Sequence, residues 1–407
     1  MHAKRLLPSL AAAALLVAAP TAAAHRSGGH HHGRTAGSTV LASGLHNPRH
    51  LDLDRNGDLY VAEAGTGGGT ASCFDSAEGP ACVGATGAVA RIPGADSRHP
   101  GAAETVVDGL ASFATAVDDP ATPENDVGNN AIGPHGIDVK HGVVYVTNGG
   151  PTEPQRDKKT VLRDTLALED PVAAGFGRLL AIRDGHVDRI ADIWGFERDN
   201  NPDKVLGNPA VDSNAVDVLR LHGRSFVTDA GGNTLLEVED DGSIAVRHIF
   251  PNKDEPNPMQ PGGIVPMQAV PTGVVKGPDG LLYVSQLTGF PFPVGGANVF
   301  VIDPHSGDIV RTISGFTNAM DLAFGPDGTL YVLEIDSDSL LPPVGPSDDG
   351  GLWTVPAGGG TPAKVAMDAG TLINPGGIDV NKKGTLFVTN KSTQAGTGEV
   401  LRITLTD

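Results

Sequence analysis

The chain repeats one pattern of hydrophobic and polar positions. A short apolar strand begins at a Pro or an Asn, a tight turn follows, and a second apolar strand carries an aromatic residue and ends on a polar one. The copies lie at residues 48–53 with 59–63, 134–139 with 144–148, 214–218 with 225–229, 271–274 with 282–286, 318–322 with 330–334 and 375–380 with 386–390. Because one such hairpin cannot bury both of its faces, these copies predict an all-β, six-bladed β-propeller.

Further apolar stretches supply the outer strands and close the ring. Two more strands are expected after each of the first five repeats, whereas the last repeat is followed by only one, at residues 399–405. Residues 38–45 form a lone strand without a hairpin partner, and we expect it to join the last blade. Such closure hides sheet edges that would otherwise pair with other chains. No window has a helical period, so no helix is predicted.

The lengths of the connections predict where a ligand binds. In a four-stranded meander, the short turns inside the repeats open on one face of the disc, which we call the short-turn face. The long connections open on the opposite, loop-rich face, and they are residues 64–86, 111–131, 149–175, 194–212, 251–270, 287–296 and 335–349. Long loops on one face of a rigid scaffold usually carry function, so the loop-rich face is the predicted binding face.

The first residues are typical of an export signal. Lys4 and Arg5 precede an apolar run, and the small residues 22–24 offer a cleavage site. We expect residues 1–24 to be a cleaved signal peptide, residues 25–37 to be a flexible linker rich in His and Gly, and residues 38–407 to be one propeller domain. The mature protein is expected to be secreted, monomeric and free of the membrane; an uncleaved anchor is the alternative.

Charge and cysteine content narrow the partners. The net charge is −19, and removal of Lys4 and Arg5 with the signal peptide makes it −21. This charge argues against nucleic acid and anionic membranes as partners, and it favours a cation, a neutral glycan, another small molecule or an extracellular protein.

Cys73 and Cys82 are the only cysteines and lie close together in a Gly-rich stretch. In an oxidising compartment they would form a disulfide.

Polar residues at the ends of the inner strands are the candidate ligand-binding site. The first strands begin with Arg49, His135, Asn214, Thr272, Asn318 and Gly376, and the second strands end with Glu63, Asn148, Asp229, Gln286, Glu334 and Asn390. At the loop-rich mouth of the channel these rings would line a polar pocket; alternatively, they cap strand ends or hold water. Calcium matches the hard oxygen ligands among them, which are Asn214, Asn318, Glu63, Asp229 and Glu334.

Two more sets of residues could carry chemistry in the channel. His135 and Arg49, with His50 beside them, are candidates for acid–base catalysis, although a lone channel His is more often a hydrogen-bonded fixture. Five first strands also contain an Asp, at Asp52, Asp138, Asp217, Asp321 and Asp379. We expect these carboxylates to accept backbone N–H groups from adjacent strands; facing a cation in the channel is the alternative.

Some of these motifs resemble known families. Residues 134–138 with 145–148, and residues 325–332, resemble NHL-type and gluconolactonase-like six-bladed propellers. With the signal peptide, the Gly44-Leu45 and Pro48-Arg49 opening and the stretch between the two cysteines, the chain is similar to the secreted ScyD/ScyE family over about residues 38–407. This resemblance implies an exported propeller without an established reaction.

Enzymes with similar architecture suggest the alternative function. Lactonases hold calcium at the starts of the inner strands, where only Asn214 and Asn318 match that pattern here. Quinone-dependent sugar dehydrogenases use a channel His and Arg, which His135 and Arg49 resemble. The sequence therefore favours a secreted binding propeller, and a channel-site enzyme, either a metal-dependent hydrolase or a quinone-dependent dehydrogenase, is the alternative. A protein-interaction scaffold is a third hypothesis.

Overall fold

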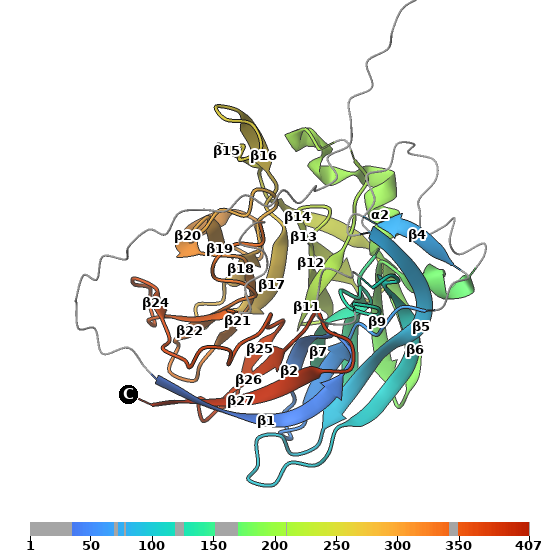
Figure 1. Cartoon of the computed structure of the whole chain (residues 1–407), viewed down its shortest axis with the longest axis vertical. Coiled ribbons are helices and arrows are strands. Elements are labelled where there is room, and N and C mark those ends of the chain that lie inside the picture. The colour runs from blue at the N-terminus through green and yellow to red at the C-terminus, as the bar shows by residue number, and fades with distance from the viewer. Residues whose placement is uncertain are drawn as a thin grey trace, which may run out of the picture.

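The computed structural model describes residues 35–68, 72–76, 79–118, 126–150, 170–208, 210–341 and 349–406. These residues form the predicted six-bladed propeller, whose blades follow one another around a central channel (Figure 1). The expected signal peptide and most of the expected linker lie outside the described residues.

The blades are antiparallel sheets that follow the repeats in chain order. Blades one and two contain β2 (Pro48–Leu53), β3 (Leu59–Glu63), β5 (Gly79–Ile92) and β6 (Glu104–Thr115), then β7 (Pro134–Lys140), β8 (Val143–Asn148), β9 (Arg178–Arg183) and β10 (His186–Asp192). Blades three and four contain β11 (Ala215–Leu221), β12 (Arg224–Asp229), β13 (Thr234–Glu239) and β14 (Ile244–Ile249), then β17 (Pro271–Lys276), β18 (Leu282–Gln286), β19 (Ala297–Ile302) and β20 (Ile309–Phe316). Blade five contains β21 (Ala319–Phe324), β22 (Leu330–Glu334), β23 (Gly351–Val355) and β24 (Ala363–Lys364).

Blade six confirms the predicted closure of the ring. It contains β25 (Ile378–Val380), β26 (Leu386–Asn390) and β27 (Gly398–Thr406), and β1 (Thr35–Leu45) pairs with β27 as its outer strand. The blue β1 and the red β27 lie side by side in Figure 1. The strand begins at Thr35, so the last residues of the expected linker already belong to the sheet.

The apolar side chains pack between blades and leave the channel polar. Each of six hydrophobic clusters joins two neighbouring blades. Val61 of blade one, for example, packs with Phe387 and Val400 of blade six. Because burial of these faces supplies the main driving force for folding, the inner edges of the first strands are free to carry charged residues.

The segment that contains both cysteines is partly sheet. Residues 64–86 were expected to be a loop, but β4 (Cys73–Ser76) pairs with an extension of β5. Cys73 and Cys82 lie directly opposite each other in this pair, and they form the predicted disulfide.

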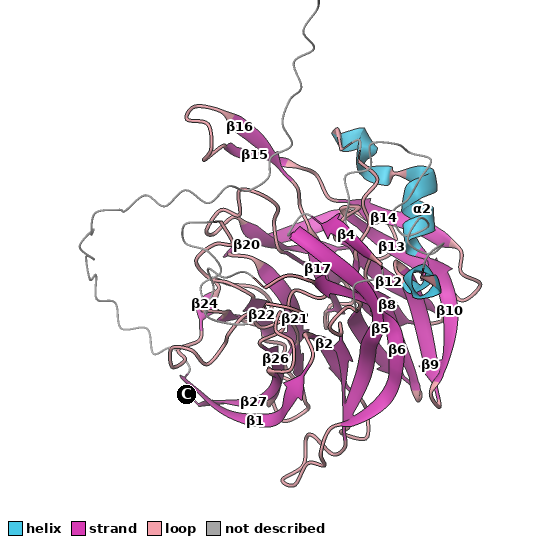
Figure 2. Ribbon diagram, turned by 45° about the vertical axis from the view of Figure 1, so that its right-hand side comes forward, coloured by secondary structure: helices cyan, strands magenta, loops and turns pink. Residues whose placement is uncertain are grey.

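The expectation that the chain has no helix is wrong. The helix α2 (Ile193–Asn200) and the 3₁₀ helices η1 (Pro171–Gly175) and η2 (Pro202–Leu206) lie in the long connections (Figure 2). Asp192 caps α2 by accepting the N–H of Gly195, and Ile193 and Trp194 are buried. Eight residues are too few to show a helical period, so the cap and the packing decide the conformation. None of the helices among the described residues has the length and apolar character that a membrane span requires.

A two-stranded hairpin stands outside the blades. Strands β15 (Lys253–Pro256) and β16 (Ile264–Met267) pair with each other and project from the disc (Figures 1 and 2). Together with α2 and η2, this hairpin occupies long connections that the sequence assigned to the loop-rich face.

Candidate functional site

The first strands surround a cavity of about 270 Å³ in the central channel. Its charged lining residues are His50, Asp52, Asp138, Lys140, Asp217, Lys276, Asp321 and Asp379. They come from the middle and the ends of the first strands, so the cavity opens on the short-turn face. Arg49 and His135, at the strand starts, are buried behind it. The sequence led us to expect a pocket at the opposite, loop-rich mouth.

The five channel aspartates link each blade to the next, as predicted. Each accepts the N–H of a residue on the first strand of the following blade. Asp52 accepts from Val139, Asp138 from Arg220, Asp217 from Val274, Asp321 from Ile378 and Asp379 from Leu53. Blade four has no such Asp, and the hydroxyl of Thr272 donates to the carbonyl of Ala319 instead. The carboxylates are therefore structural. Their second oxygens differ: Oδ1 of Asp217 contacts His50 and Oδ1 of Asp138 accepts from Lys140, whereas Oδ1 of Asp321 and of Asp379 accepts the N–H of the next residue.

These aspartates lie in two layers, not at one equivalent position. Asp52, Asp138 and Asp379 each lie opposite the aromatic residue of the second strand in the strand register. Their partners are Tyr60, Tyr145 and Phe387, respectively. Asp217 and Asp321 pair with Thr228 and Leu333, closer to the start of the strand. We call Asp52, Asp138 and Asp379 the outer layer, and His50, Asp217 and Asp321 the inner layer.

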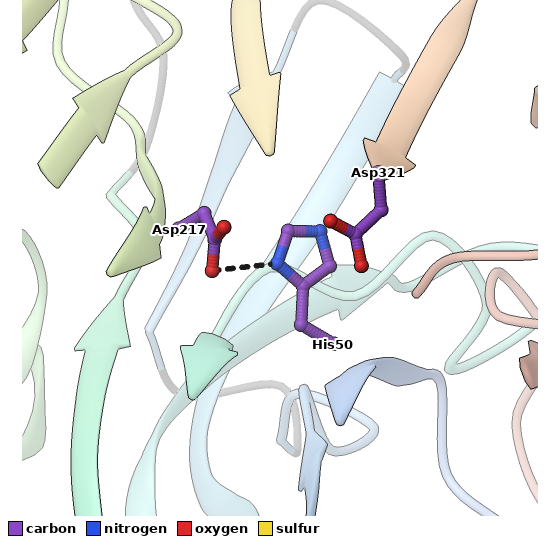
Figure 3. Close-up of side chains that lie close together, drawn as sticks. All are labelled: His50, Asp217 and Asp321. Atoms are coloured by element: carbon purple, nitrogen blue, oxygen red, sulfur yellow. Dashed lines mark ion pairs between the residues drawn. The ribbon is translucent and has the colours of Figure 1, made fainter. Parts of the chain in front are cut away.

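The inner layer joins alternate blades. His50 of blade one lies between Asp217 of blade three and Asp321 of blade five (Figure 3), and its Nδ1 is 2.9 Å from Oδ1 of Asp217. Blades two, four and six have Gly136, Gly273 and Gly377 at this level. A Cβ on Gly136 would lie 2.3 Å from Cα of Asp217, and one on Gly377 would lie 2.6 Å from Cα of His50. Glycine in alternate blades thus leaves room for the three charged side chains.

The inner layer is a coupled charge system. Burial alone would lower the pKa of His50, but the carboxylates of Asp321 and Asp217 outweigh burial and raise this pKa to about 9. Burial raises the pKa of Asp321 to about 7, and the charge of Asp217 adds to the rise, while His50 opposes it. At neutral pH His50 is therefore an imidazolium between two acids.

The same three side chains meet one requirement of a metal site. Their donor atoms all lie within 4.8 Å of one another, and one imidazole with two carboxylates is a donor set for divalent metals. A metal ion would have to displace the proton of His50 first, because an imidazolium cannot coordinate.

The outer layer concentrates negative charge on one side of the cavity. Burial and the charges of Asp138 and Asp379 raise the pKa of Asp52 well above its ordinary value. Burial also raises the pKa of Asp379, to about 6, and raises that of Asp138. Lys140 donates to Oδ1 of Asp138 and is the cation that contacts this layer. One lysine therefore faces three carboxylates from blades six, one and two.

Of the six predicted residues at the strand starts, five are buried: Arg49, His135, Thr272, Asn318 and Gly376. Asn214 is half-buried, and its Oδ1 has no hydrogen-bond partner among the described residues. Arg49 donates to the carbonyl of Ala131, Asn318 donates to that of Leu287, and Thr272 donates to that of Ala319. His135 packs edge-on against His50 with ring centroids 5.2 Å apart. Burial and the positive charges of Arg49 and His50 hold the pKa of His135 well below its usual range, so His135 is neutral.

The predicted residues at the ends of the second strands hold the long connections. Glu63, Asp229, Glu334 and Asn390 accept the N–H of His46, Asn214, Thr317 and Ile373, while Asn148 donates to the carbonyl of Gly175 and Gln286 accepts from Asn298. Within the described ranges, the three acids among the predicted calcium ligands, Glu63, Asp229 and Glu334, do not form a group with donor atoms within 4.8 Å of one another. A ligand at this ring stays a prediction.

Comparisons with known proteins show the fold alone. No protein-family model matches the chain, and no curated protein matches it. The chain is similar to streptogramin B lyase, with 11% identity and a TM-score of 0.46 over 92% of this chain and 98% of that one. It is similar to PQQ-bound aldose sugar dehydrogenase from Streptomyces coelicolor, with 13% identity and a TM-score of 0.47 over 91% of this chain and 99% of that one. It is also similar to a protein of unknown function from Bacteroides thetaiotaomicron, with 9% identity and a TM-score of 0.50 over 92% of this chain and 76% of that one. Membership of the ScyD/ScyE family stays a prediction.

Proposed function

We propose that this protein is an exported binding propeller that holds a small cationic molecule, such as an organic amine, in the acidic channel cavity. The observation that carries the proposal is the outer layer, in which Asp52, Asp138 and Asp379 face one lysine. An ammonium group among these carboxylates would stabilise their charged forms, which burial and the repulsion between neighbouring carboxylates now disfavour.

The size and position of the cavity support a small, polar ligand. Pockets for drug-sized ligands usually enclose roughly 300–1,000 Å³, and this cavity of about 270 Å³ lies below that range. A glycan or a peptide would need more space, whereas a short amine would fit. The inner layer supplies Asp217 and Asp321 at the buried end, and the exposed Lys276 lies at the open end.

Two observations support export. The apolar run after Lys4 and Arg5 is typical of a signal peptide, and the Cys73–Cys82 disulfide is typical of an oxidising compartment. In this proposal the loop-rich face remains available for an extracellular partner.

Calorimetric titration of the mature protein tests the channel ligand. We expect putrescine to bind at low salt and neutral pH, and its uncharged analogue 1,4-butanediol not to bind. Asp52→Asn should weaken putrescine binding at least tenfold, because it removes one carboxylate charge and keeps an oxygen for the N–H of Val139. The matched control is Asp254→Asn, an exposed carboxylate on the projecting hairpin. Equal affinity of wild type and Asp52→Asn for putrescine would refute the proposal.

One observation favours an enzyme as the second candidate. In the described part of the chain, Nε2 of His50 has no hydrogen-bond partner, while Nδ1 is bound by Asp217. An acid that orients a histidine in this way is typical of general acid–base catalysis. With a pKa of about 9, His50 would donate a proton and not accept one. If a turnover is found, His50→Gln should abolish it and leave ligand binding intact.

A further inference from the structure

A second pocket, which we call the seam pocket, lies between blades one and two. Its volume is about 310 Å³, and it shares no lining residue with the channel cavity. Blade one supplies residues 109–111 of β6, blade two supplies Asn148, Leu180, Val187 and Arg189, and the 3₁₀ helix η1 supplies the rest of the lining. The seam pocket is therefore separate from the channel.

The strand register of blade two places three of these residues on one face of the sheet. Asn148 lies opposite Arg178, Leu180 comes two residues later on β9, and Arg189 lies opposite Leu180. Side chains that are directly opposite or two residues apart share a face of a sheet. With strands about 4.8 Å apart and a rise of about 3.4 Å per residue, the Cα atoms of Asn148 and Arg189 are about 12 Å apart. The pocket thus runs from a polar group beside η1 to a second one on the outer strand.

Asn148 brings an unsatisfied acceptor to the seam pocket. Its Nδ2 donates to the carbonyl of Gly175 at 2.9 Å, but its Oδ1 is buried and has no hydrogen-bond partner among the described residues. The equivalent residues at the ends of the other five second strands each have an oxygen that accepts a hydrogen bond; they are Glu63, Asp229, Gln286, Glu334 and Asn390. A buried oxygen without a donor is costly to the fold, and a donor from a bound molecule would remove that cost.

Arg189 brings a positive charge to the other end of the pocket. Its side chain is exposed and makes no ion pair with the described residues. Among the described residues that line the pocket, it is the only charged one. Asp188, its neighbour in sequence, lies opposite Ala181 and so faces the other side of blade two. The guanidinium is therefore available to an anionic group, and a carboxylate matches its two parallel donors.

The surface between these two polar groups is apolar. Leu110, Ala111 and Leu180 are buried, while Val172 and Val187 are half-buried. A hydrocarbon group that packs against these side chains leaves water, which favours binding. Pockets for drug-sized ligands enclose roughly 300–1,000 Å³, and the seam pocket lies at the lower end of that range. Its size matches one ring or one branched chain with a short acid arm.

We propose that the seam pocket binds a small hydroxy acid with an apolar body, such as a phenolic acid. The hydroxyl would donate to Oδ1 of Asn148, the apolar body would pack against Leu180, and the carboxylate would bind Arg189. A monocarboxylate is favoured over a phosphate, because the net charge of −19 repels a second negative charge on the ligand. This site does not rest on the proposed function.

Calorimetry of the mature protein with three related ligands tests the site. We expect 4-hydroxyphenylacetate to bind with one molecule per chain. Phenylacetate lacks the hydroxyl and 4-methylphenol lacks the carboxylate. Each should therefore bind about tenfold more weakly, since each loses one hydrogen-bonded group.

Matched variants assign each group of the ligand to its partner. Arg189→Gln should weaken the binding of 4-hydroxyphenylacetate about tenfold and leave that of 4-methylphenol unchanged. Asn148→Ala should make 4-hydroxyphenylacetate and phenylacetate bind equally, because the hydroxyl then has no acceptor. The control is Arg183→Gln, which changes an exposed arginine of β9 outside the pocket and should leave all three affinities unchanged.

Three results would overturn the proposal. The first is the absence of saturable binding of 4-hydroxyphenylacetate by the wild type. The second is equal affinity of the wild type and Arg189→Gln for this ligand. The third is loss of its binding in Asp52→Asn, which would place the ligand in the channel cavity. If Asn148→Ala does not fold, Arg189→Gln decides, because Arg189 is exposed.

Discussion

His50 of blade one hydrogen-bonds to Asp217 of blade three, and blade two lies between them in sequence. The contact spans the channel because blade two contributes Gly136 at this level. The inner layer therefore connects blades that are not neighbours, in addition to the bonds by which each aspartate joins adjacent blades. The carboxylates of Asp217 and Asp321 therefore both raise the pKa of His50 and hold neighbouring blades together.

The first prediction concerns the pH dependence of stability. The folded-state pKa of His50, about 9, lies above the unfolded value of 6.5. Its contribution to the free energy of unfolding, on the order of 3 kcal/mol, is therefore fully present below pH 6.5 and is lost as the pH rises through 9. Urea unfolding between pH 6 and pH 10 should show this loss, and His50→Gln should remove this part of the pH dependence. An unchanged profile in the variant would contradict the assignment.

The second prediction concerns the charge that holds the His50 proton. Asp217→Asn should lower the pKa of His50, because Asp217 contributes to the rise by its charge and by a hydrogen bond. NMR titration of the His50 ring protons measures this shift. Asp254→Asn removes one carboxylate on the projecting hairpin, and it should leave the titration of His50 unchanged.

The third prediction concerns the bonds between blades. Asp321→Ala should lower the free energy of unfolding by about 1–3 kcal/mol, because it leaves the N–H of Ile378 without its acceptor. Asp321→Asn keeps an oxygen at the same place and should lose less. Urea denaturation compares the two variants. Equal losses would show that the charge, not the hydrogen bond, stabilises this joint.

The fourth prediction concerns the glycines at the level of the inner layer. A Cβ on Gly273 would lie 2.5 Å from Oδ1 of Asp321, so Gly273→Ala should cost about 1–3 kcal/mol of stability by overpacking. Gly37→Ala is the control, since no atom lies within 4 Å of a Cβ there. Thermal unfolding of both variants should separate crowding in the channel from a general effect of replacing glycine in a strand.

The fifth prediction concerns a conflict between stability and binding. The pKa of Asp52 is raised by burial and by Asp138 and Asp379, so its charged form destabilises the fold at high pH. Asp52→Asn should therefore raise the free energy of unfolding at pH 8 by about 1 kcal/mol, with a smaller gain at pH 4, where the wild-type carboxyl is protonated. Melting curves at both pH values, read beside the putrescine titration, test whether the variant gains stability while it loses affinity.

The sequence was sufficient to predict the propeller because each repeat carries its own local signals. Turns such as the one at Gly328, aromatic anchors such as Tyr331 and the lone N-terminal strand each specify a piece of the ring. The helix α2 was missed because its cap and its buried Trp194 act through contacts with the blades. Such contacts are not visible in a stretch of eight residues.

The channel chemistry was only partly predictable, because it depends on strand register. The sequence supplied the five aspartates and His50, and it predicted that the aspartates would bond backbone N–H groups. It did not separate the two layers, since they differ in where the Asp lies in its strand. Asp217 lies two residues before Leu219, the partner of the aromatic anchor Phe226. Asp321 likewise lies two residues before Ala323, the partner of Tyr331. Glycine at positions 136, 273 and 377, alternating with charged residues at 50, 217 and 321, was the signal that could have revealed the inner layer.

The pairing of β1 with β27 also sets the order in which the protein can fold. A chain made from its N-terminus releases β1 first, yet the partner of β1 is the last strand to emerge. Until then β1 has no place in a sheet, and the five intervening blades form an open arc with an exposed edge at each end. Completion of the ring thus acts as a check on full-length synthesis, since a product truncated before residue 398 would keep both edges open to proteases and to other chains.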